Sequence, residues 1–235
     1  MIRFFTAGES HGPGLLIIVE GVPAGLKISE DYIAIQLGRR QKGYGRGGRM
    51  LIEQDWAKII SGVRHGLTLG SPIGMQIENK DWVNWLEAMA IEHVENLSQE
   101  GRNQRVTRIR PGHADLPGTM KYGFDDVRNS LERASARETA ARVAAGAVAM
   151  ALLDEFGIAL HSHVISIGSV SANPAESIDW TAVEDSPVRC ADSDAANKMM
   201  LAIDAAKDAG DTLGGTVEVI ADLSLIHISE PTRLG

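Results

Sequence analysis

The chain has 235 residues, of which 44% are hydrophobic and 23% are charged, a composition typical of a soluble globular protein with one or two domains. Its formal net charge of −8 argues against a nucleic acid as the main partner, because nucleic-acid-binding domains usually carry a basic excess. The single cysteine, Cys190, excludes an internal disulfide, and without a membrane-length apolar run or a signal peptide we expect a cytoplasmic protein with no membrane partner.

The first half of the chain predicts three strands and one helix. A short apolar run predicts a buried strand at 14–20. A helix follows, for which Ser29 is a suitable N-cap, and acidic residues at its start with basic residues at its end complement the helix dipole. The apolar run 57–63 and the alternating residues 73–77 predict two further strands.

Two helices are expected next. Large side chains from Trp82 to His93 recur at helical spacing, which predicts an amphipathic helix over 82–98. The alanine-rich stretch 133–155 predicts a second helix that ends before Gly157. Because this helix has small side chains on every face, we expect it inside the fold, between sheet layers. The remaining expected elements are a strand at 164–170, a helix from Asp192 or Ser193 to about Gly210, and a strand at 216–221.

Four segments place titratable or cationic side chains among glycines, and the first is Gly8–Gly14. It sets Ser10 and His11 side by side, and glycines allow the backbone to approach a ligand closely. An imidazole can take or deliver a proton near neutral pH. A turn in which both side chains cap backbone groups remains an alternative. No Gly-x-Ser-x-Gly elbow is present, which disfavours acyl transfer.

The second segment is the arginine- and glycine-rich stretch Arg39–Arg49. Guanidinium groups bind phosphate and carboxylate in a bidentate manner, so this loop suits a small polyanion. A solvated basic loop or an RNA-contacting loop would show the same pattern. Neither a P-loop nor a dinucleotide-binding glycine motif occurs, so an ordinary nucleotide site is not indicated.

The third segment, Arg110–Asp115, contains a Pro-Gly turn from which His113 projects beside Arg110. The Asp115 carboxylate would either orient the imidazole or cap the next segment, and a plain surface turn is the alternative.

The fourth segment, Glu132–Val148, places Arg133 and Arg137 on one helix face with Ser135 beside them. Backbone N–H groups at a helix start also attract anions. A helix with exposed ion pairs is the alternative. His161 and His163 alternate on an expected strand, but no third ligand is near them in sequence, so we expect no metal site.

In this order, the four segments resemble those of the chorismate synthases, from about Arg3 to Asp222. The resemblance implies an α/β fold, a β-α-β sandwich with helices between sheet layers, usually assembled as a homotetramer. It also implies a lyase of the shikimate pathway of aromatic amino acid biosynthesis. Such enzymes form chorismate from 5-enolpyruvylshikimate 3-phosphate by an anti-1,4 elimination of phosphate and a ring hydrogen. They require reduced FMN without net redox change, with NADPH as an indirect reductant. No segment suggests an intrinsic flavin reductase, so a separate one is expected.

The resemblance also implies roles for individual residues. His11 corresponds to the acid that protonates the departing phosphate, His113 to a partner of the reduced flavin, and Ser10 to a hydrogen-bonding support, so these three are the expected catalytic residues. Arg40 and Arg46 are expected to bind substrate, with NADP as the alternative ligand. The expected flavin-binding residues are His113, Arg133, Ala134 and Ser135, and the expected substrate-binding residues are Arg40, Arg46, Arg110 and Arg137.

The resemblance ends before the family's own sequence does. We therefore expect residues 1–222 to be the N-terminal part of a single domain that is incomplete at its C-terminus, and 223–235 to be a non-native tail. The part of the family not matched holds further flavin contacts and the aspartate that takes the ring proton. A non-catalytic fragment that binds an anion or flavin is therefore the alternative to the enzyme.

Overall fold

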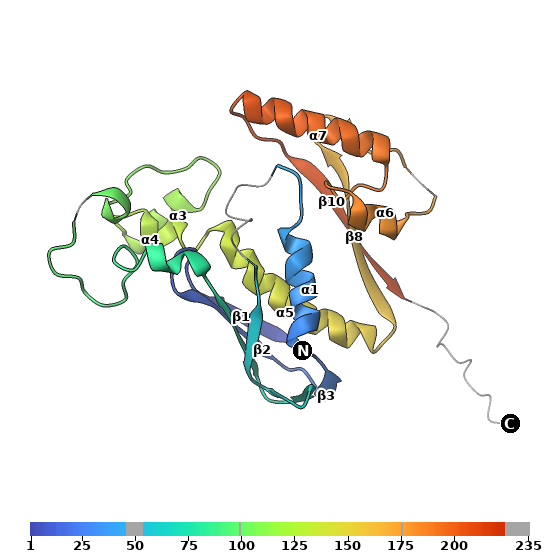
Figure 1. Cartoon of the computed structure of the whole chain (residues 1–235), viewed down its shortest axis with the longest axis horizontal. Helices are drawn as coiled ribbons and strands as arrows, with labels where there is room; N and C mark the ends of the chain where they lie inside the picture. The colour runs from blue at the N-terminus through green and yellow to red at the C-terminus, as the bar shows by residue number, and fades with distance from the viewer. Residues whose placement is uncertain (46–53, 99, 175, 224–235) are drawn as a thin grey trace. The chain divides into compact units, whose positions relative to one another are not determined.

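A computed structural model describes residues 1–45, 54–98, 100–174 and 176–223. The chain divides into two compact units, the first comprising Met1–Arg40 and Leu51–Ala151, the second Gln41–Met50 and Leu152–Gly235. Both units combine strands and helices, so the expected α/β class is confirmed (Figure 1). No helix within these described ranges is long and apolar enough to cross a membrane.

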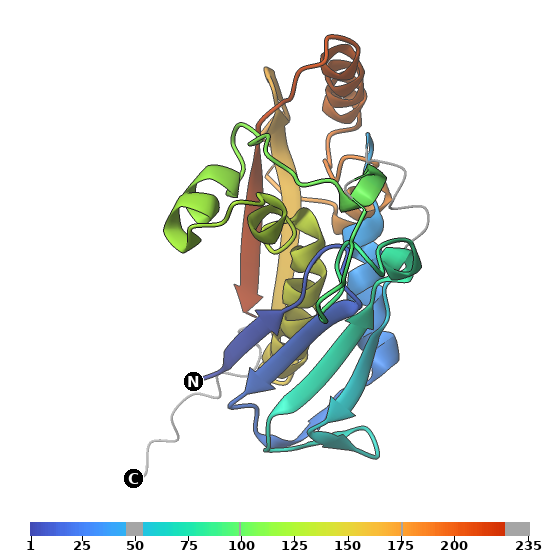
Figure 2. The same ribbon diagram turned by 90° about the vertical axis from the view of Figure 1, so that its left-hand side faces the viewer.

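An antiparallel sheet of order β1-β2-β7-β4 forms the centre of the first unit. Burial alternates along β2, where Leu15 is fully buried and the next residue, Leu16, is 50% exposed, so the two faces of the sheet differ. Figures 1 and 2 show α1 and α5 against one face. The three strands expected in this half of the chain are therefore confirmed. They are β2 Gly14–Glu20, β4 Ala57–Ser61, which ends two residues earlier than expected, and β7 Ile73–Glu78. The fourth strand of this sheet, β1 Arg3–Ala7, was not predicted.

A smaller antiparallel sheet of order β3-β6-β5 completes the strands of the first unit. Thr68 is buried in it, where its hydroxyl accepts the Leu26 N–H at 2.9 Å and donates to the Pro23 carbonyl at 2.6 Å. The hydroxyl thus satisfies both of its hydrogen-bonding roles. The strands are β3 Ala24–Lys27, β5 Val63–Arg64 and β6 Leu67–Leu69.

Helix α1, Glu30–Gln41, forms as predicted, with the Ser29 hydroxyl accepting the Tyr32 N–H at 3.1 Å. The alanine-rich helix begins later than predicted. Ser135 is extended (φ −62°, ψ 148°) and accepts the Arg137 N–H, so a 3-10 turn, η3 (Ala136–Glu138), precedes α5 (Thr139–Asp154). Between residues 140 and 153 of α5, Arg142 is the one exposed residue, which agrees with an interior helix.

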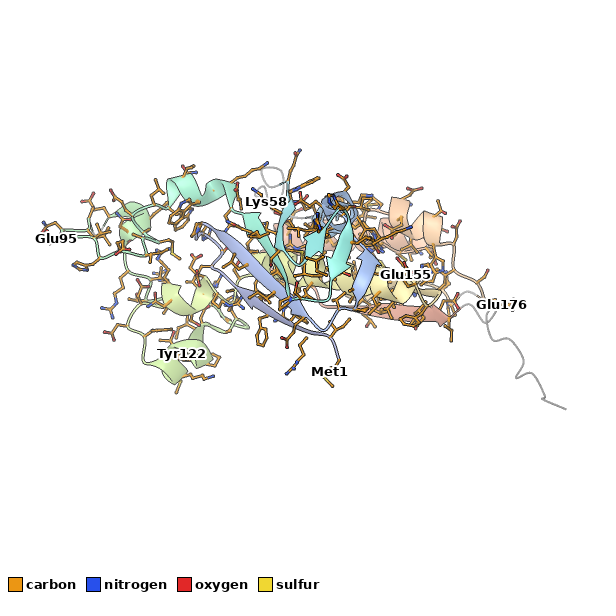
Figure 3. All side chains as sticks on the ribbon, turned by 90° about the horizontal axis from the view of Figure 1, so that it is seen from below. Met1, Lys58, Glu95, Tyr122, Glu155 and Glu176 are labelled. Carbon is orange, nitrogen blue, oxygen red and sulfur yellow. The ribbon has the colours of Figure 1, made fainter. Side chains whose placement is uncertain are left out.

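The helix predicted over 82–98 is wrong. The chain forms the short 3-10 helix η1, Lys80–Asn84, and then turns. Asp81 takes hydrogen bonds from the side chains of Asn84 and Trp85, each at 2.8 Å, and Asn96 is left-handed at φ 57°. Figure 3 shows Glu95 and Tyr122 at one end of the unit, away from Lys58 on the sheet. The other short elements are η2 Gly101–Asn103, α3 Asp115–Tyr122 and α4 Arg128–Leu131.

The second unit has an antiparallel sheet of order β10-β8-β9 and two helices. Helix α7 forms as predicted, with the Asp192 carboxylate accepting the Ala195 N–H at 3.0 Å, and it buries Met199. The strand predicted at 164–170 is divided by a turn at Gly168 (φ +59°). The bounds are β8 Ile158–Ile167, β9 Val170–Ser171, α6 Trp180–Asp185, α7 Ser193–Asp208 and β10 Gly215–Leu223.

Replacing Gly8 by alanine should destabilise the protein more than replacing Gly25. Both glycines have positive φ (+110° and +89°), a conformation that costs a side-chain-bearing residue about 1–3 kcal/mol. A Cβ at Gly8 would also lie 2.3 Å from the Gly14 carbonyl oxygen, whereas a Cβ at Gly25 meets nothing within 4 Å. We expect the difference, measured by urea unfolding, to be about 1–3 kcal/mol. Equal losses would mean that the Gly8–Gly14 approach relaxes freely.

Candidate functional site

Buried polar side chains gather in one network of the first unit. Burying a polar group is costly unless it is hydrogen-bonded, so such a concentration marks a functional region. Apart from Thr68, every buried polar or charged side chain among the described residues belongs to this network or adjoins it. They are Ser10, Asp55, Asn79, Asp115, Ser130, Glu132 and Arg137.

His11 lies between a carboxylate and an indole. Its Nδ1 is 2.9 Å from both oxygens of Glu132, and its backbone N–H donates to the same carboxylate at 2.9 Å. The Trp85 ring stacks on the imidazole with centroids 4.0 Å apart. The Glu132 side chain is 1% exposed and that of His11 22%, so the carboxylate is buried while the imidazole reaches the surface. This arrangement suits a histidine that exchanges a proton with a ligand.

The structure brings Ser10 and Ser135 together with this histidine. Ser10 is 3% exposed, and its backbone N–H donates to the Glu132 carbonyl at 3.0 Å. The Ser135 hydroxyl donates to the Ser10 hydroxyl at 3.1 Å and accepts the Arg137 N–H at 3.3 Å. The first and fourth sequence segments therefore meet in one site.

Arg137 is buried and held by protein oxygens. Its guanidinium donates to Asp55 at 2.5 Å, to the Asn79 side-chain oxygen at 2.8 Å and to the Glu78 carbonyl at 3.3 Å. The amide of Asn79 in turn donates to the Gly12 carbonyl at 2.8 Å. Arg137 is thus linked through Asn79 to the Gly8–Gly14 segment.

Arg40, near the end of α1, contacts the same Asp55 carboxylate. Its Nη1 lies 3.5 Å from Asp55, while Nε donates to the Thr139 hydroxyl at 3.0 Å and Nη2 to the Ala136 carbonyl at 2.9 Å. Two guanidinium groups therefore face one carboxylate, and these three groups together carry an excess positive charge. Such an excess attracts an anionic ligand. Arg46, the other expected arginine of this loop, lies outside the described residues.

The His113 turn contains a second histidine–carboxylate pair. Asp115 is fully buried, and its carboxylate lies 2.5 Å from Nδ1 of His113. Arg110 donates to it through Nε at 3.0 Å, Nη2 at 3.2 Å and its backbone N–H at 3.0 Å. The contact with Nδ1 allows the Asp115 carboxylate to orient the His113 ring. The Ser130 hydroxyl donates to the Ala114 carbonyl at 3.0 Å, which ties this turn to α4.

The Arg110 guanidinium is the main cause of a low pKa at Asp115, which falls from 3.8 to about 2. A carboxyl whose pKa is lower in the folded state stabilises the protein fully above its unfolded pKa and loses that effect as the pH falls through the folded pKa. Asp115 should therefore contribute about 2 kcal/mol that disappears between about pH 4 and pH 2.

Arg110→Met should remove most of this pH dependence. We expect its urea-unfolding midpoint to decline less between about pH 5 and pH 2.5 than that of the wild type. Arg108→Met, which alters an exposed arginine two residues earlier, is the matched control and should retain the wild-type decline. Identical acid profiles for Arg110→Met and the wild type would contradict the assignment.

The remaining predicted site residues are more exposed. The Arg133 side chain is 40% exposed and donates to both oxygens of Thr6 at 2.9 Å, and its Nη1 lies 3.6 Å from Glu138. Ala134 is exposed, and its N–H donates to the Ser130 carbonyl at 3.1 Å. Both follow Glu132 directly in sequence.

Four residues of the network have no role predicted from the sequence: Asp55, Asn79, Trp85 and Glu132. Glu132 and Asn79 had weak signals, since one opens the fourth segment and the other directly follows strand β7. Asp55 and Trp85 had none, because the network residues that they contact, Arg137 and His11, lie far away in sequence.

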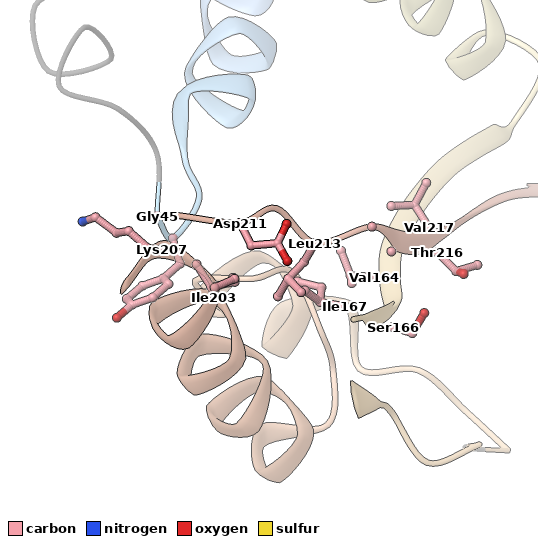
Figure 4. A pocket seen from close by; sticks show the side chains of 14 residues that line it. Gly45, Val164, Ser166, Ile167, Ile203, Lys207, Asp211, Leu213, Thr216 and Val217 are labelled. Carbon is pink, nitrogen blue, oxygen red and sulfur yellow. The ribbon is translucent and has the colours of Figure 1, made fainter. Parts of the chain in front are cut away.

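A separate cavity of 670 Å³ lies in the second unit (Figure 4). Its walls are largely aliphatic, including Val164, Ile203 and Leu213, and none of the predicted site residues that the structure describes line it. We place the candidate site at the polar network, because that network holds the groups able to exchange protons and bind anions.

The histidines of β8 also lie in the second unit. His161 stacks on Trp180 at 4.4 Å, and His163 contacts Glu218 at 2.8 Å. Within the described ranges, no three His, Cys, Asp or Glu side chains are arranged to hold a metal ion.

The fold is α/β, and its candidate site pairs histidines with buried carboxylates beside clustered arginines, an arrangement able to exchange protons and bind anions. The chain belongs to the chorismate synthase family, whose model matches residues 2–233. Chorismate synthases of Geobacillus sp. (strain WCH70) and Bacillus subtilis (strain 168) are 57% and 54% identical to it, each over 94% of this chain. A crystal structure of a chorismate synthase is 41% identical with a TM-score of 0.73, again over 94% of this chain. The chain spans 58% of the length of each of these proteins.

Proposed function

We propose that the chain carries the N-terminal part of the active site of a chorismate synthase, a lyase that eliminates phosphate from 5-enolpyruvylshikimate 3-phosphate. The observation that carries this proposal is the single hydrogen-bonded network that joins Ser10, His11 and Ser135 to the arginine–aspartate cluster. The names of the relatives support the enzyme over a non-catalytic anion- or flavin-binding fragment.

The substrate is proposed to bind through Arg40, Arg46, Arg110 and Arg137. It carries a phosphate and carboxylates, and fixed guanidinium groups stabilise such charge without reorganising during the reaction. Arg40 and Arg137 are already positioned by Asp55, and half of the Arg110 side chain is exposed. We assign these arginines to substrate rather than to NADP.

His11 is proposed to supply the proton in the phosphate-releasing step. The bond between the ring carbon and the phosphate oxygen breaks, the phosphate leaves with that oxygen, and His11 protonates it. A base in the part of the family that this chain does not match takes the ring proton four atoms away from the departing oxygen. The electron pair of that C–H bond forms a new double bond, the existing double bond shifts by one position, and the electron pair of the C–O bond leaves with the phosphate, so the elimination is balanced. Ser10 supports the histidine segment through its bond to Ser135.

The residues proposed to hold reduced FMN are His113, Arg133, Ala134 and Ser135. Their chemistry fits a flavin, because a half-exposed guanidinium, an oriented imidazole and a hydroxyl suit an anionic ring and a phosphate. When bound, the flavin would supply transient electron density to the substrate. His113 is oriented for this contact by Asp115.

Several wider features belong to the same proposal. We propose a cytoplasmic homotetramer that receives reduced flavin from a separate reductase, with NADPH as the indirect reductant. We also propose that the native sequence of this chain ends near Asp222 and that 223–235 are a non-native tail, although the match to the family model extends to residue 233. Leu223 still pairs with Ile158 in β10, and residues 224–235 lie outside the described part.

An anaerobic assay with reduced FMN tests the proposed function. The chain as it stands is compared with a chimera in which residues 1–222 are followed by the corresponding C-terminal part of the Bacillus subtilis relative. Chorismate formation by the chimera is expected, with little or none from the unextended chain. A folded chimera that binds flavin and substrate but forms no chorismate would contradict the proposal.

A further inference from the structure

Glu132 contacts both the side chain and the backbone of His11. Its carboxylate is 1% exposed and lies 2.9 Å from Nδ1 through both oxygens. One oxygen also accepts the His11 backbone N–H at 2.9 Å. Arg128 lies one helical turn earlier, with its guanidinium 3.8 Å from the same carboxylate, so opposite charges attract there.

These contacts constrain the imidazole chemically. An ionised carboxylate has no proton to donate, so its hydrogen bond to Nδ1 requires a proton on Nδ1. In a neutral ring the lone pair then resides on Nε2. Trp85, stacked on the ring at 4.0 Å and itself covered by Arg102 at 5.0 Å, restricts rotation of the ring plane.

We propose that Glu132 is the positioning residue of His11: it holds a proton on Nδ1, so that the imidazolium gives its Nε2 proton to the ligand and returns to the neutral Nδ1–H tautomer. This inference rests on the proposed function, in which His11 protonates the departing phosphate. A partner that fixes the tautomer of a functional histidine acts through that histidine; in serine proteases, loss of such a carboxylate lowers kcat by about 10⁴-fold.

A purely structural role would use the same carboxylate to hold the Gly8–Gly14 backbone through the His11 N–H. The two roles differ in one measurable property, because only the positioning role depends on which ring nitrogen carries the proton. Glu132→Gln separates them, since an amide has nearly the same shape but presents one oxygen and one NH₂ group. An NH₂ group facing Nδ1 requires the lone pair there, which favours the Nε2–H tautomer.

Nitrogen-15 NMR of the histidine side chains in this chain provides the test, at a pH where the rings are neutral. We expect His11 to show a protonated Nδ1 in the wild type and in Glu132→Asp, and mainly a protonated Nε2 in Glu132→Gln. Glu30→Gln is the matched control, because Glu30 also accepts one ring N–H, from Trp56, and one backbone N–H, from Ile59, each at 2.8 Å. It should leave the His11 signals unchanged.

A wild-type His11 protonated on Nε2 would overturn the proposal, even if Glu132→Gln failed to fold. An unchanged tautomer in folded Glu132→Gln would overturn it as well. Because this measurement needs neither substrate nor flavin, its outcome is independent of whether the chimera forms chorismate. In an active chimera, Glu132→Gln should lower kcat by about 10-fold or more with little change in KM.

Discussion

Replacement of Asp55 by alanine should lower the free energy of unfolding by about 3–5 kcal/mol, which is the usual cost of breaking a buried ion pair by removing one partner. Asp55 is 7% exposed and receives hydrogen bonds from Arg137 and Arg40. Without it, the Arg137 side chain, which is 5% exposed, would remain buried without its countercharge. Urea unfolding at neutral pH measures the loss.

The matched control for this experiment is Asp125→Ala. Asp125 also pairs with an arginine, Arg105, at 3.5 Å, but its side chain is 92% exposed. Exposed ion pairs contribute about 0–1 kcal/mol, so this variant should unfold almost as the wild type does. Similar losses for both variants would show that Asp55 is not needed to compensate a buried charge.

Replacement of His11 by alanine should reduce turnover of the chimera by about 100-fold or more, because a positioned general acid contributes about 10²–10⁴-fold to a rate. Flavin binding should be nearly unchanged, since the proposed flavin-binding residues do not include His11. Stopped-flow absorbance under anaerobic conditions gives the turnover, and flavin titration gives the affinity.

His93→Ala serves as the control, because His93 is an exposed histidine in the turns after η1. It should keep both turnover and flavin affinity. Normal turnover in His11→Ala would remove His11 from the proposed role, whatever the other residues of the network do.

Elements with strong local signals were predictable from the sequence. Helices α1 and α7 begin at the capping residues Ser29 and Asp192, because a cap acts on N–H groups only two or three residues away. Strands β2 and β7 follow from short apolar or alternating runs that place one set of side chains in the core. Such signals are contained within the element itself.

The errors in the fold arise where side chains bond outside the local pattern. The stretch 82–98 has helical periodicity, but Trp85 stacks on His11 and hydrogen-bonds to Asp81 instead of packing along a helix. The alanine-rich helix starts late because Ser135 bonds to Ser10 and caps η3. In both places, contacts made within the site outweigh the local helix propensity of the sequence.

Only part of the candidate site could be predicted from the sequence, for a similar reason. Ser10 and His11 are adjacent in sequence, and the His113 turn contains its own Asp115, so their chemistry was visible. The partners that give the network its geometry lie far away: Glu132 is 121 residues from His11, and Arg137 is 82 from Asp55. A single sequence contains no signal for such pairings.

The buried alanines of α5 have a consequence for how this gene can change. Ala140 and Ala144 are fully buried and Ala147 is 1% exposed, so any larger side chain at these positions must push a neighbouring element aside. Arg142, on the exposed side of the same helix, carries no such restriction. We therefore expect α5 to accept larger residues at its solvent-facing positions and to reject them at its buried alanines.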